Sequence, residues 1–349
     1  FAGGLLVMAS KGEFFWPIVG MLAFSGAFAS PFFFLALFPK MLTKMPKSGG
    51  WMNIMKVTMG FVEVGAALKF LSVADTAFFG QPTVLTHNIV MGLWFLLAVL
   101  AGLYPLGLYR MPHDMPGKFT AGRLAFAVPF LALAGLLGTG LFTSIQPSGW
   151  IWDNVVAFAP PKFESPDQTD AKEAEAVTAD IGPYVENDEL PYALDFFEAL
   201  DYARETKQPI FLDITGQNCQ NCRLMEYRVF PRPENRELLK RFVRVKLFTD
   251  QIPIIEEESE RKDLININKK IQIATNKSVA LPGYVVSNPY NVGEDGKLIM
   301  LSWYEGMEKN EGEFTKFLND GLEVWQKQSG EDAVQAAATT DRSQSITQK

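Results

Sequence analysis

The first 150 residues alternate between long apolar runs and short polar loops. The apolar runs cover residues Phe14–Phe38, Met55–Ala74, Val84–Tyr109 and Leu124–Phe142. Because a helix rises about 1.5 Å per residue, about 20 residues are enough to cross a hydrocarbon core of about 30 Å. Buried core helices are the alternative, but soluble proteins do not carry several runs of this length. The pattern predicts an all-α transmembrane helical bundle with four spans over residues 1–145.

The loops between these runs differ in charge, and the difference predicts their orientation. Most of the basic residues in this part of the chain lie in the loops after the first and third runs. The loop after the first run carries Lys40, Lys44 and Lys47, and the loop after the third carries Arg110, Lys118 and Arg123. Loops rich in Lys and Arg stay on the cytoplasmic side of a membrane. We therefore expect everything after residue 145 to lie on the extracytoplasmic side.

After the fourth run the chain changes character. Residues 146–190 are acidic and rich in Pro, Ala and Thr, which is typical of an extended linker. Residues 191–328 alternate between short apolar segments and amphipathic segments, which indicates a globular domain. Residues 329–349 are polar, and they predict a disordered tail.

The elements predicted within residues 191–328 indicate an α/β domain. Strands are expected over Pro209–Ile214, Val243–Phe248, Gly283–Val286 and Leu298–Trp303, and helices over Ala193–Glu205, from Cys219, and over Glu234–Phe242, Leu264–Ile271 and Glu311–Gln326. This order predicts a central mixed sheet flanked by helices.

Composition and charge narrow the possible functions. Hydrophobic residues make up 48% of the 349 residues, which excludes a disordered chain. The net charge is −7 and no long Lys/Arg cluster is present, so we expect no nucleic-acid partner. Two cysteines and two histidines are too few for a disulfide scaffold or a typical zinc site, so we expect no cofactor and no metal. The chain begins at Phe1 without a signal-peptide pattern, and we interpret it as truncated at its N-terminus.

Both cysteines lie in one motif, Cys219-Gln220-Asn221-Cys222, between a predicted strand and a predicted helix. The N-terminus of a helix presents unpaired N–H groups and the positive end of the helix dipole, and both stabilise a thiolate. We therefore predict that Cys219 is the exposed nucleophile and that Cys222 is the resolving thiol. The alternatives are a structural disulfide, half of a zinc site, or two inert buried thiols. A zinc site needs a second ligand pair, and so short a disulfide loop removes little chain entropy.

Two further residues are candidates for the same site. Asp213 ends an apolar segment six residues before Cys219. If buried, it could take the proton of Cys222, because burial raises the pKa of a carboxyl group; a solvated Asp at a strand end is the equal alternative. Pro282 precedes another predicted strand. A cis bond there would let the backbone of Leu281 face the sulfurs and pair with an incoming peptide, although few X–Pro bonds are cis.

These features together resemble the thioredoxin fold. The whole arrangement resembles the DsbD family of thiol:disulfide interchange proteins, also called the cytochrome c biogenesis transmembrane family. The similarity is carried by residues 211–216 and 219–226, and by residues 46–51 between the first two apolar runs. The resemblance implies an α/β thioredoxin-like C-terminal domain in which Cys219 attacks, Cys222 resolves, Asp213 moves protons and the bond before Pro282 is cis.

The resemblance also implies a function. Such proteins carry reducing equivalents from cytoplasmic thioredoxin, through a membrane domain with its own Cys pair, to extracytoplasmic disulfide-containing proteins. We therefore expect a protein-disulfide reductase in the lipid of the bacterial inner membrane, acting in cytochrome c maturation or disulfide repair. The alternatives are a disulfide oxidase or isomerase, and a thiol-based copper or haem-maturation binding module without turnover, for which Met225 is the nearest further ligand.

The chain departs from the family pattern in three respects. The family's membrane domain has more spans than four and carries the electron-donor Cys pair, whereas both cysteines of this chain lie in the C-terminal domain. Thioredoxins usually place Trp before the first Cys, where this chain has Asn218, so we expect a more polar surface around Cys219. Residues 250–277 look like an insertion before the strand that follows Pro282.

Overall fold

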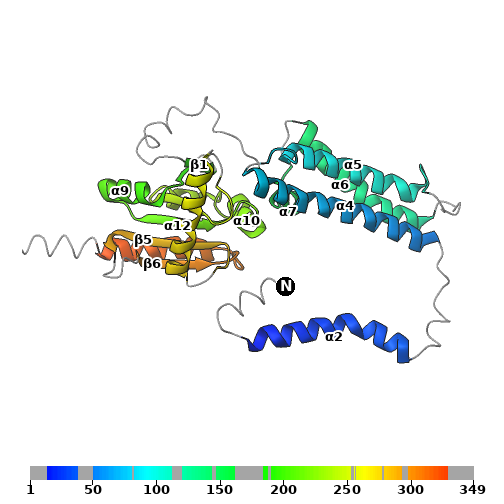
Figure 1. The fold of residues 1–349 in the computed structure, drawn as a ribbon, viewed down its shortest axis with the longest axis horizontal. Coiled ribbons are helices and arrows are strands. Elements are labelled where there is room, and N and C mark those ends of the chain that lie inside the picture. The colour runs from blue at the N-terminus through cyan, green and yellow to red at the C-terminus, as the bar shows by residue number, and fades with distance from the viewer. Residues whose placement is uncertain are drawn as a thin grey trace, which may run out of the picture. The chain divides into compact units, whose positions relative to one another are not determined.

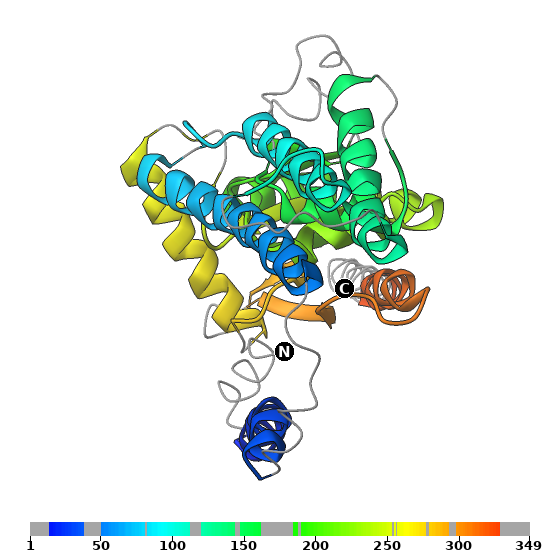
Figure 2. The ribbon, with the colours of Figure 1, turned by 90° about the vertical axis from the view of Figure 1, so that its right-hand side faces the viewer.

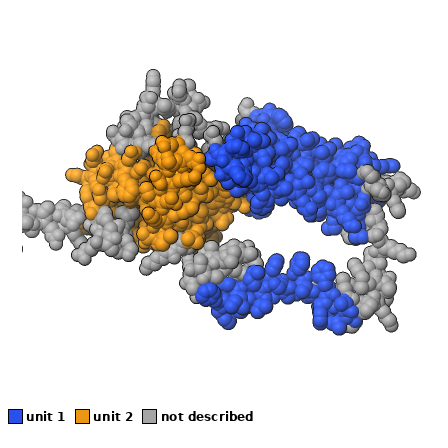
Figure 3. Space-filling view, in the orientation of Figure 1, with its two compact units in different colours: residues 1–162 blue, residues 163–349 orange. Residues whose placement is uncertain are grey.

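The computed structural model describes residues 14–37, 50–80, 82–111, 120–143, 147–161, 184–187, 190–252, 255, 257–276, 279–292 and 298–328. The chain divides into two compact units, residues 1–162 and residues 163–349 (Figure 3). Each unit has its own hydrophobic core. The division between them falls inside the segment that the sequence predicts to be a linker.

All the regular elements that the structure describes in the first unit are helices. Its helices are α2 (Phe15–Leu37), α4 (Gly50–Phe79), α5 (His87–Leu106), α6 (Ala121–Phe142) and α7 (Trp150–Phe158). Helix α5 packs against both α4 and α6 (Figure 1). A glycine allows α5 and α6 to approach closely, because a Cβ added at Gly102 would lie 2.6 Å from Leu131 Cγ.

Three helices in the described part are long and apolar enough to cross a membrane. They are Met52–Phe79, His87–Leu106 and Ala121–Phe142. Of the four predicted spans, the described part of the chain therefore supports three. The first predicted span corresponds to α2, within which Phe15–Ser30 is a shorter apolar stretch among the described residues.

Helix α7 corrects the prediction that residues 146–190 are a linker throughout. This helix packs against α6 so closely that a Cβ added at Gly140 would overlap the ring of Trp152. Trp94 of α5 stacks on Phe158 at a centroid distance of 5.8 Å, which holds the end of α7. Partial burial of these aromatic rings explains why the segment folds. Several features predicted from the sequence lie outside the described residues. They are the acidic stretch 162–183, the tail 329–349, and the loop residues Lys40, Lys44, Lys47 and Lys118.

The second unit is built on a six-stranded sheet with the strand order β1-β2-β4-β3-β5-β6. The strands are β1 (Tyr184–Asn187), β2 (Leu190–Ala193), β3 (Ile210–Thr215), β4 (Val243–Phe248), β5 (Gly283–Val292) and β6 (Leu298–Glu305). Strand β3 is central, because it pairs parallel with β4 and antiparallel with β5. The sheet is therefore mixed, as the sequence predicts.

Helices cover both faces of this sheet. They are α9 (Phe196–Thr206), α10 (Gln220–Arg228), α11 (Pro233–Leu239), α12 (Glu258–Asn276) and a C-terminal helix over residues 313–328. Figure 2 shows α12, in yellow, and the C-terminal helix, in red-orange, on opposite sides of the sheet. The predicted α/β fold class of the C-terminal domain is confirmed.

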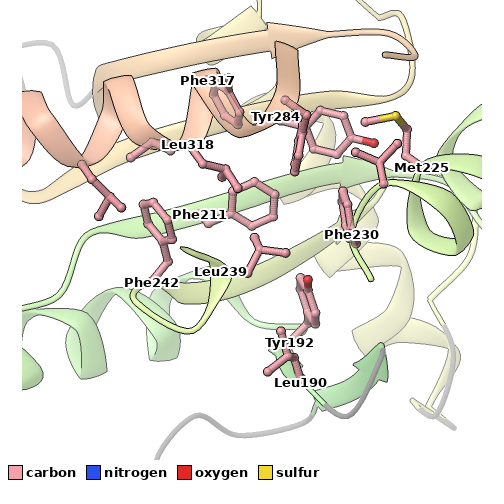
Figure 4. Close-up of a cluster of buried hydrophobic side chains, with 14 residues drawn as sticks. Leu190, Tyr192, Phe211, Met225, Phe230, Leu239, Phe242, Tyr284, Phe317 and Leu318 are labelled. Carbon is pink, nitrogen blue, oxygen red and sulfur yellow. The ribbon is translucent and has the colours of Figure 1, made fainter. Parts of the chain in front are cut away.

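The two faces of β3 explain why its sequence is apolar without interruption. Phe211 points to one face, where its ring stacks on Tyr284 of β5 at a centroid distance of 6.1 Å (Figure 4). Ile210, Leu212 and Ile214 belong to a second cluster with residues of α9 on the other face. A strand that is buried on both faces needs apolar side chains at nearly every position. A polar residue in such a strand, as Asp213 is, therefore stands out.

Several parts of the second unit differ from the sequence prediction. Strand β5 runs to Val292, beyond the predicted end at Val286. Strands β1 and β2 are not predicted, because each has only four residues and Pro191 within β2 argues against a strand. Helix α12 extends well beyond the predicted Leu264–Ile271. The sequence does not predict its first turns, because they are polar and carry no apolar periodicity. The stretch interpreted as an insertion therefore supplies a helix that packs on β4, β5 and β6.

Candidate active site

The two cysteines lie where β3 leads into α10. Cys219 is the N-cap residue of α10, and its Sγ accepts a hydrogen bond from the Cys222 N–H at 3.2 Å. The two sulfurs form a disulfide with an S–S distance of 2.02 Å. The structure thus brings together the predicted pair at a helix N-terminus. The unpaired N–H groups and the positive dipole end there favour a thiolate on Cys219 when the disulfide is reduced.

The two cysteine residues differ in their exposure to solvent. Cys219 is half-buried, whereas Cys222 is 1% exposed. A partner protein can therefore reach Cys219 much more easily than Cys222. This asymmetry favours the predicted roles, in which Cys219 is the attacking thiol and Cys222 is the resolving thiol.

Asp213 lies beneath the helix that carries the cysteines. It projects from β3 on the same face as Phe211 and is 1% exposed. Its Oδ2 has no hydrogen-bond partner among the described residues. Burial raises the pKa of Asp213 to about 8, nearby Lys246 works against this rise, and Glu226 adds to it. The environment is therefore the buried one that the proton-transfer hypothesis requires, not that of a solvated strand end.

A buried ion pair next to Asp213 is missing from the sequence prediction. Lys246 of β4 lies directly across from Asp213 in the parallel β3–β4 register. Its Nζ is 2.7 Å from Oε1 of Glu226, and both side chains are largely buried. Glu226 lies on α10, one turn beyond Cys222. A lysine in the otherwise apolar second half of β4 is the signal that could have pointed to this pair.

Pro282 lies at the start of β5, next to the loop that precedes Cys219. The Leu281–Pro282 bond is cis, as the family resemblance implies. The Pro282 carbonyl accepts a hydrogen bond from the Gly306 N–H at 2.8 Å. A Cβ added at Gly216 would lie 3.2 Å from Leu281 Cδ1, so the loop before Pro282 is in contact with the loop before Cys219.

The described residues offer little for metal binding. No group of three or more His, Cys, Asp or Glu side chains among them could hold a metal ion. Met225 is fully buried, and its Sδ accepts a hydrogen bond from the Glu308 N–H at 3.3 Å. Its side chain thus belongs to the hydrophobic core, where Figure 4 shows it beside Tyr284. This packing does not favour a role as a copper ligand.

Comparison with known proteins gives two kinds of match. A family model described as thioredoxin-like matches residues 191–289. The thiol:disulfide interchange protein DsbD of Pseudomonas fluorescens is 26% identical over 239 residues, which cover 68% of this chain and 35% of that protein. DsbD of Vibrio vulnificus is 26% identical over 242 residues, which cover 69% of this chain and 34% of that protein.

These matches support a DsbD-like protein with a thioredoxin-like domain at its C-terminus. The chain spans about a third of the length of the curated relatives that it matches. The matched thioredoxin-like region contains Cys219, Cys222, Asp213 and Pro282.

Proposed function

We propose that this chain is a membrane-anchored protein-disulfide reductase that passes electrons to disulfide-containing partner proteins. The observation that carries the proposal is the Cys219–Cys222 disulfide at the N-terminus of α10, in which Cys219 is half-buried and Cys222 is fully buried. The similarity to proteins named thiol:disulfide interchange protein supports it.

The reaction begins from the reduced dithiol. The Cys219 thiolate attacks one sulfur of the partner disulfide, forming a mixed disulfide and releasing the first partner thiolate. Cys222 then loses its proton, and its thiolate attacks Cys219 Sγ. This second step forms the Cys219–Cys222 disulfide and releases the second partner thiolate. Two electrons have passed to the partner, whose two thiolates take up two protons from the surroundings.

In this proposal, Asp213 accepts the proton of Cys222 and later returns it. It accepts that proton in its carboxylate form, which is the minority form at neutral pH because the pKa is about 8, while Cys222 attacks Cys219. In the oxidised protein its raised pKa of about 8 keeps the proton on the carboxyl group at neutral pH. When a donor reduces the disulfide again, the Asp213 carboxyl returns the proton to the leaving Cys222 thiolate.

The electrons must come from a donor outside this sequence, because its two cysteines are those of the active site. We propose a membrane domain with its own Cys pair as the donor and cytoplasmic thioredoxin as the ultimate source. The chain lies in the bacterial inner membrane, with the thioredoxin-like domain on the periplasmic side, as the basic loops predict. The final acceptors are proteins of cytochrome c maturation or of disulfide repair.

Stoichiometric reduction of a protein disulfide tests this function. The purified full chain is reduced, freed of reductant and mixed with a disulfide-containing protein, and new partner thiols and remaining chain thiols are counted. We expect two partner thiols to appear for each Cys219–Cys222 disulfide formed. Cys219→Ser should produce none. Partner thiols that form equally well with Cys219→Ser, or a wild-type chain that transfers no electrons, would exclude the proposal.

A further inference from the structure

Two of the three residues that join β3 to Cys219 are hydrogen-bonded to a single carboxylate, that of Asp250. The Gln217 N–H donates to Oδ1 of Asp250 at 2.8 Å, and the Asn218 N–H donates to Oδ2 at 3.0 Å. The same loop is closed by the Cys219 N–H, which donates to the Gly216 carbonyl at 3.0 Å. Both carboxylate oxygens of Asp250 therefore accept hydrogen bonds from the two residues that immediately precede the attacking cysteine.

Asp250 is itself held in place by its neighbours. It comes two residues after the end of β4, and its Oδ1 also accepts a hydrogen bond from the Gln251 N–H at 2.7 Å. Thr249 ties this segment to the end of β3, because its N–H donates to the Thr215 carbonyl at 3.0 Å. Asn268 of α12 donates from Nδ2 to the Phe248 carbonyl at 2.9 Å. The segment that carries this carboxylate is thus hydrogen-bonded to both β3 and α12.

The Asp250 carboxylate also lies in tight contact with the loop backbone. A Cβ added at Gly216 would lie 3.2 Å from Asp250 Oδ2, 3.3 Å from its Cγ and 3.2 Å from Leu281 Cδ1. Only glycine fits at this position without a shift of the surrounding atoms. The loop before Cys219, the segment after β4 and the loop before Pro282 therefore meet around Gly216.

The charge of this carboxylate opposes the effect of the helix N-terminus. The N–H groups of α10 stabilise a thiolate on Cys219, whereas a negative charge close by destabilises it. Asp250 is only partly exposed, so solvent does not fully screen the interaction. A less stable thiolate makes the reduced dithiol less stable relative to the disulfide, and the couple becomes a stronger reductant.

We propose that Asp250 is a positioning residue for Cys219, which fixes the loop before it and, through its negative charge, keeps the Cys219–Cys222 couple reducing. The inference rests on the proposed function in so far as that couple is reversible. It assigns a role in the redox chemistry to a residue that lies 31 positions beyond Cys219 in the sequence.

The first test is the thiol–disulfide equilibrium of the full chain with a glutathione series. Asp250→Asn keeps the shape and one acceptor oxygen but removes the charge. We expect its equilibrium to shift toward the dithiol by about three- to tenfold, the size of a charge effect near a protein surface. Asp250→Glu, which keeps the charge, should stay within about twofold of wild type. Asp320→Asn, on an exposed position of the C-terminal helix, is the matched control and should not shift it.

The second test does not require a reversible couple. In the Cys222→Ser background Cys219 is the only thiol, and its alkylation rate is measured as a function of pH. Asp250→Asn should move the midpoint of this profile to lower pH, whereas Asp320→Asn should leave it in place. An unchanged profile in Asp250→Asn, or an equal shift in Asp250→Glu, would overturn the proposal. Absence of a reversible couple in the wild-type chain would instead exclude the proposed function.

Discussion

Lys246 Nζ lies 2.7 Å from Glu226 Oε1, and this ion pair joins the middle of the sheet to the helix that carries both cysteines. Lys246 faces Asp213 across the β3–β4 pair, so one cation serves two carboxyl groups. The ionisation of Asp213 is therefore linked to α10, on which the resolving thiol lies.

Replacing the shared cation should destabilise the second unit. Lys246→Met leaves Glu226 largely buried without its partner, and breaking a buried ion pair on one side costs about 3–5 kcal/mol. The loss should appear in urea unfolding of the oxidised full chain at pH 7. The double variant Glu226→Gln/Lys246→Met should recover much of it, because no unpaired charge remains. A loss below about 1 kcal/mol in the single variant would show that the pair is not buried as the structure has it.

Asp213 should make the folded protein less stable as the pH rises. Its pKa is about 8 in the folded protein, whereas an exposed Asp, as in the unfolded chain, has an ordinary pKa of 3.8. The folded protein therefore binds this proton more tightly, and its stabilising effect is present below about pH 4 and is lost as the pH rises through about 8. Asp213→Asn stays neutral at every pH. Its free energy of unfolding relative to wild type should rise by at least about 1.4 kcal/mol, the value of one pKa unit, between pH 5 and pH 9.

The check is urea unfolding of both oxidised proteins at these two pH values. Asp201→Asn, at an exposed position, serves as the control. An equal stability difference at pH 5 and pH 9 would contradict the assignment of a raised pKa to Asp213. The same variant should also slow the resolution of mixed disulfides, because Cys222 loses its proton acceptor.

Single-cysteine variants should separate the roles of the two sulfurs. In Cys222→Ser, the accessible Cys219 can attack a partner but cannot be resolved, so a mixed disulfide should accumulate. In Cys219→Ser, the remaining thiol is buried, and little mixed disulfide should form. Non-reducing electrophoresis after incubation with a disulfide-containing protein measures both. Equal trapping by the two variants would mean that burial does not decide which cysteine attacks.

The orientation in the membrane can be tested with introduced cysteines. In a Cys219→Ser/Cys222→Ser background, Ser48→Cys lies in the first basic loop and Ser329→Cys directly follows the C-terminal helix in the sequence. In intact cells we expect Ser48→Cys to react only with a membrane-permeant reagent. With the outer membrane opened, Ser329→Cys should react with an impermeant one. The opposite pattern would reverse the predicted orientation.

The sequence predicts the local environment of the site well. The apolar segment before Asp213, the helix start at Cys219 and the strand Val243–Phe248 each depend on neighbouring residues, and the structure has them at or within one residue of the expected positions. Burial of β3 on both faces follows from its continuous apolar sequence. The strand order cannot be predicted in the same way, because it depends on which strands pair.

The residues that the sequence analysis missed all act across distant elements. Lys246 meets Asp213 and Glu226 only because β4 lies beside β3 and α10 crosses above them. Asp250 meets the loop before Cys219 from 32 and 33 residues away. In the first unit, apolar composition predicts the helices, and three of the four predicted spans correspond to membrane-length apolar helices among the described residues.

The reduction potential of the Cys219–Cys222 couple in the full chain tests the central claim most directly. It is measured against a glutathione or dithiothreitol series, and the chain has no other cysteines to interfere. A reductase should have a potential near that of thioredoxin, about −270 mV, or somewhat above it. A value near about −120 mV would make the domain an oxidant, and the proposed direction of electron flow would be wrong. Absence of any reversible couple would leave metal or partner binding, without turnover, as the function of the two thiols.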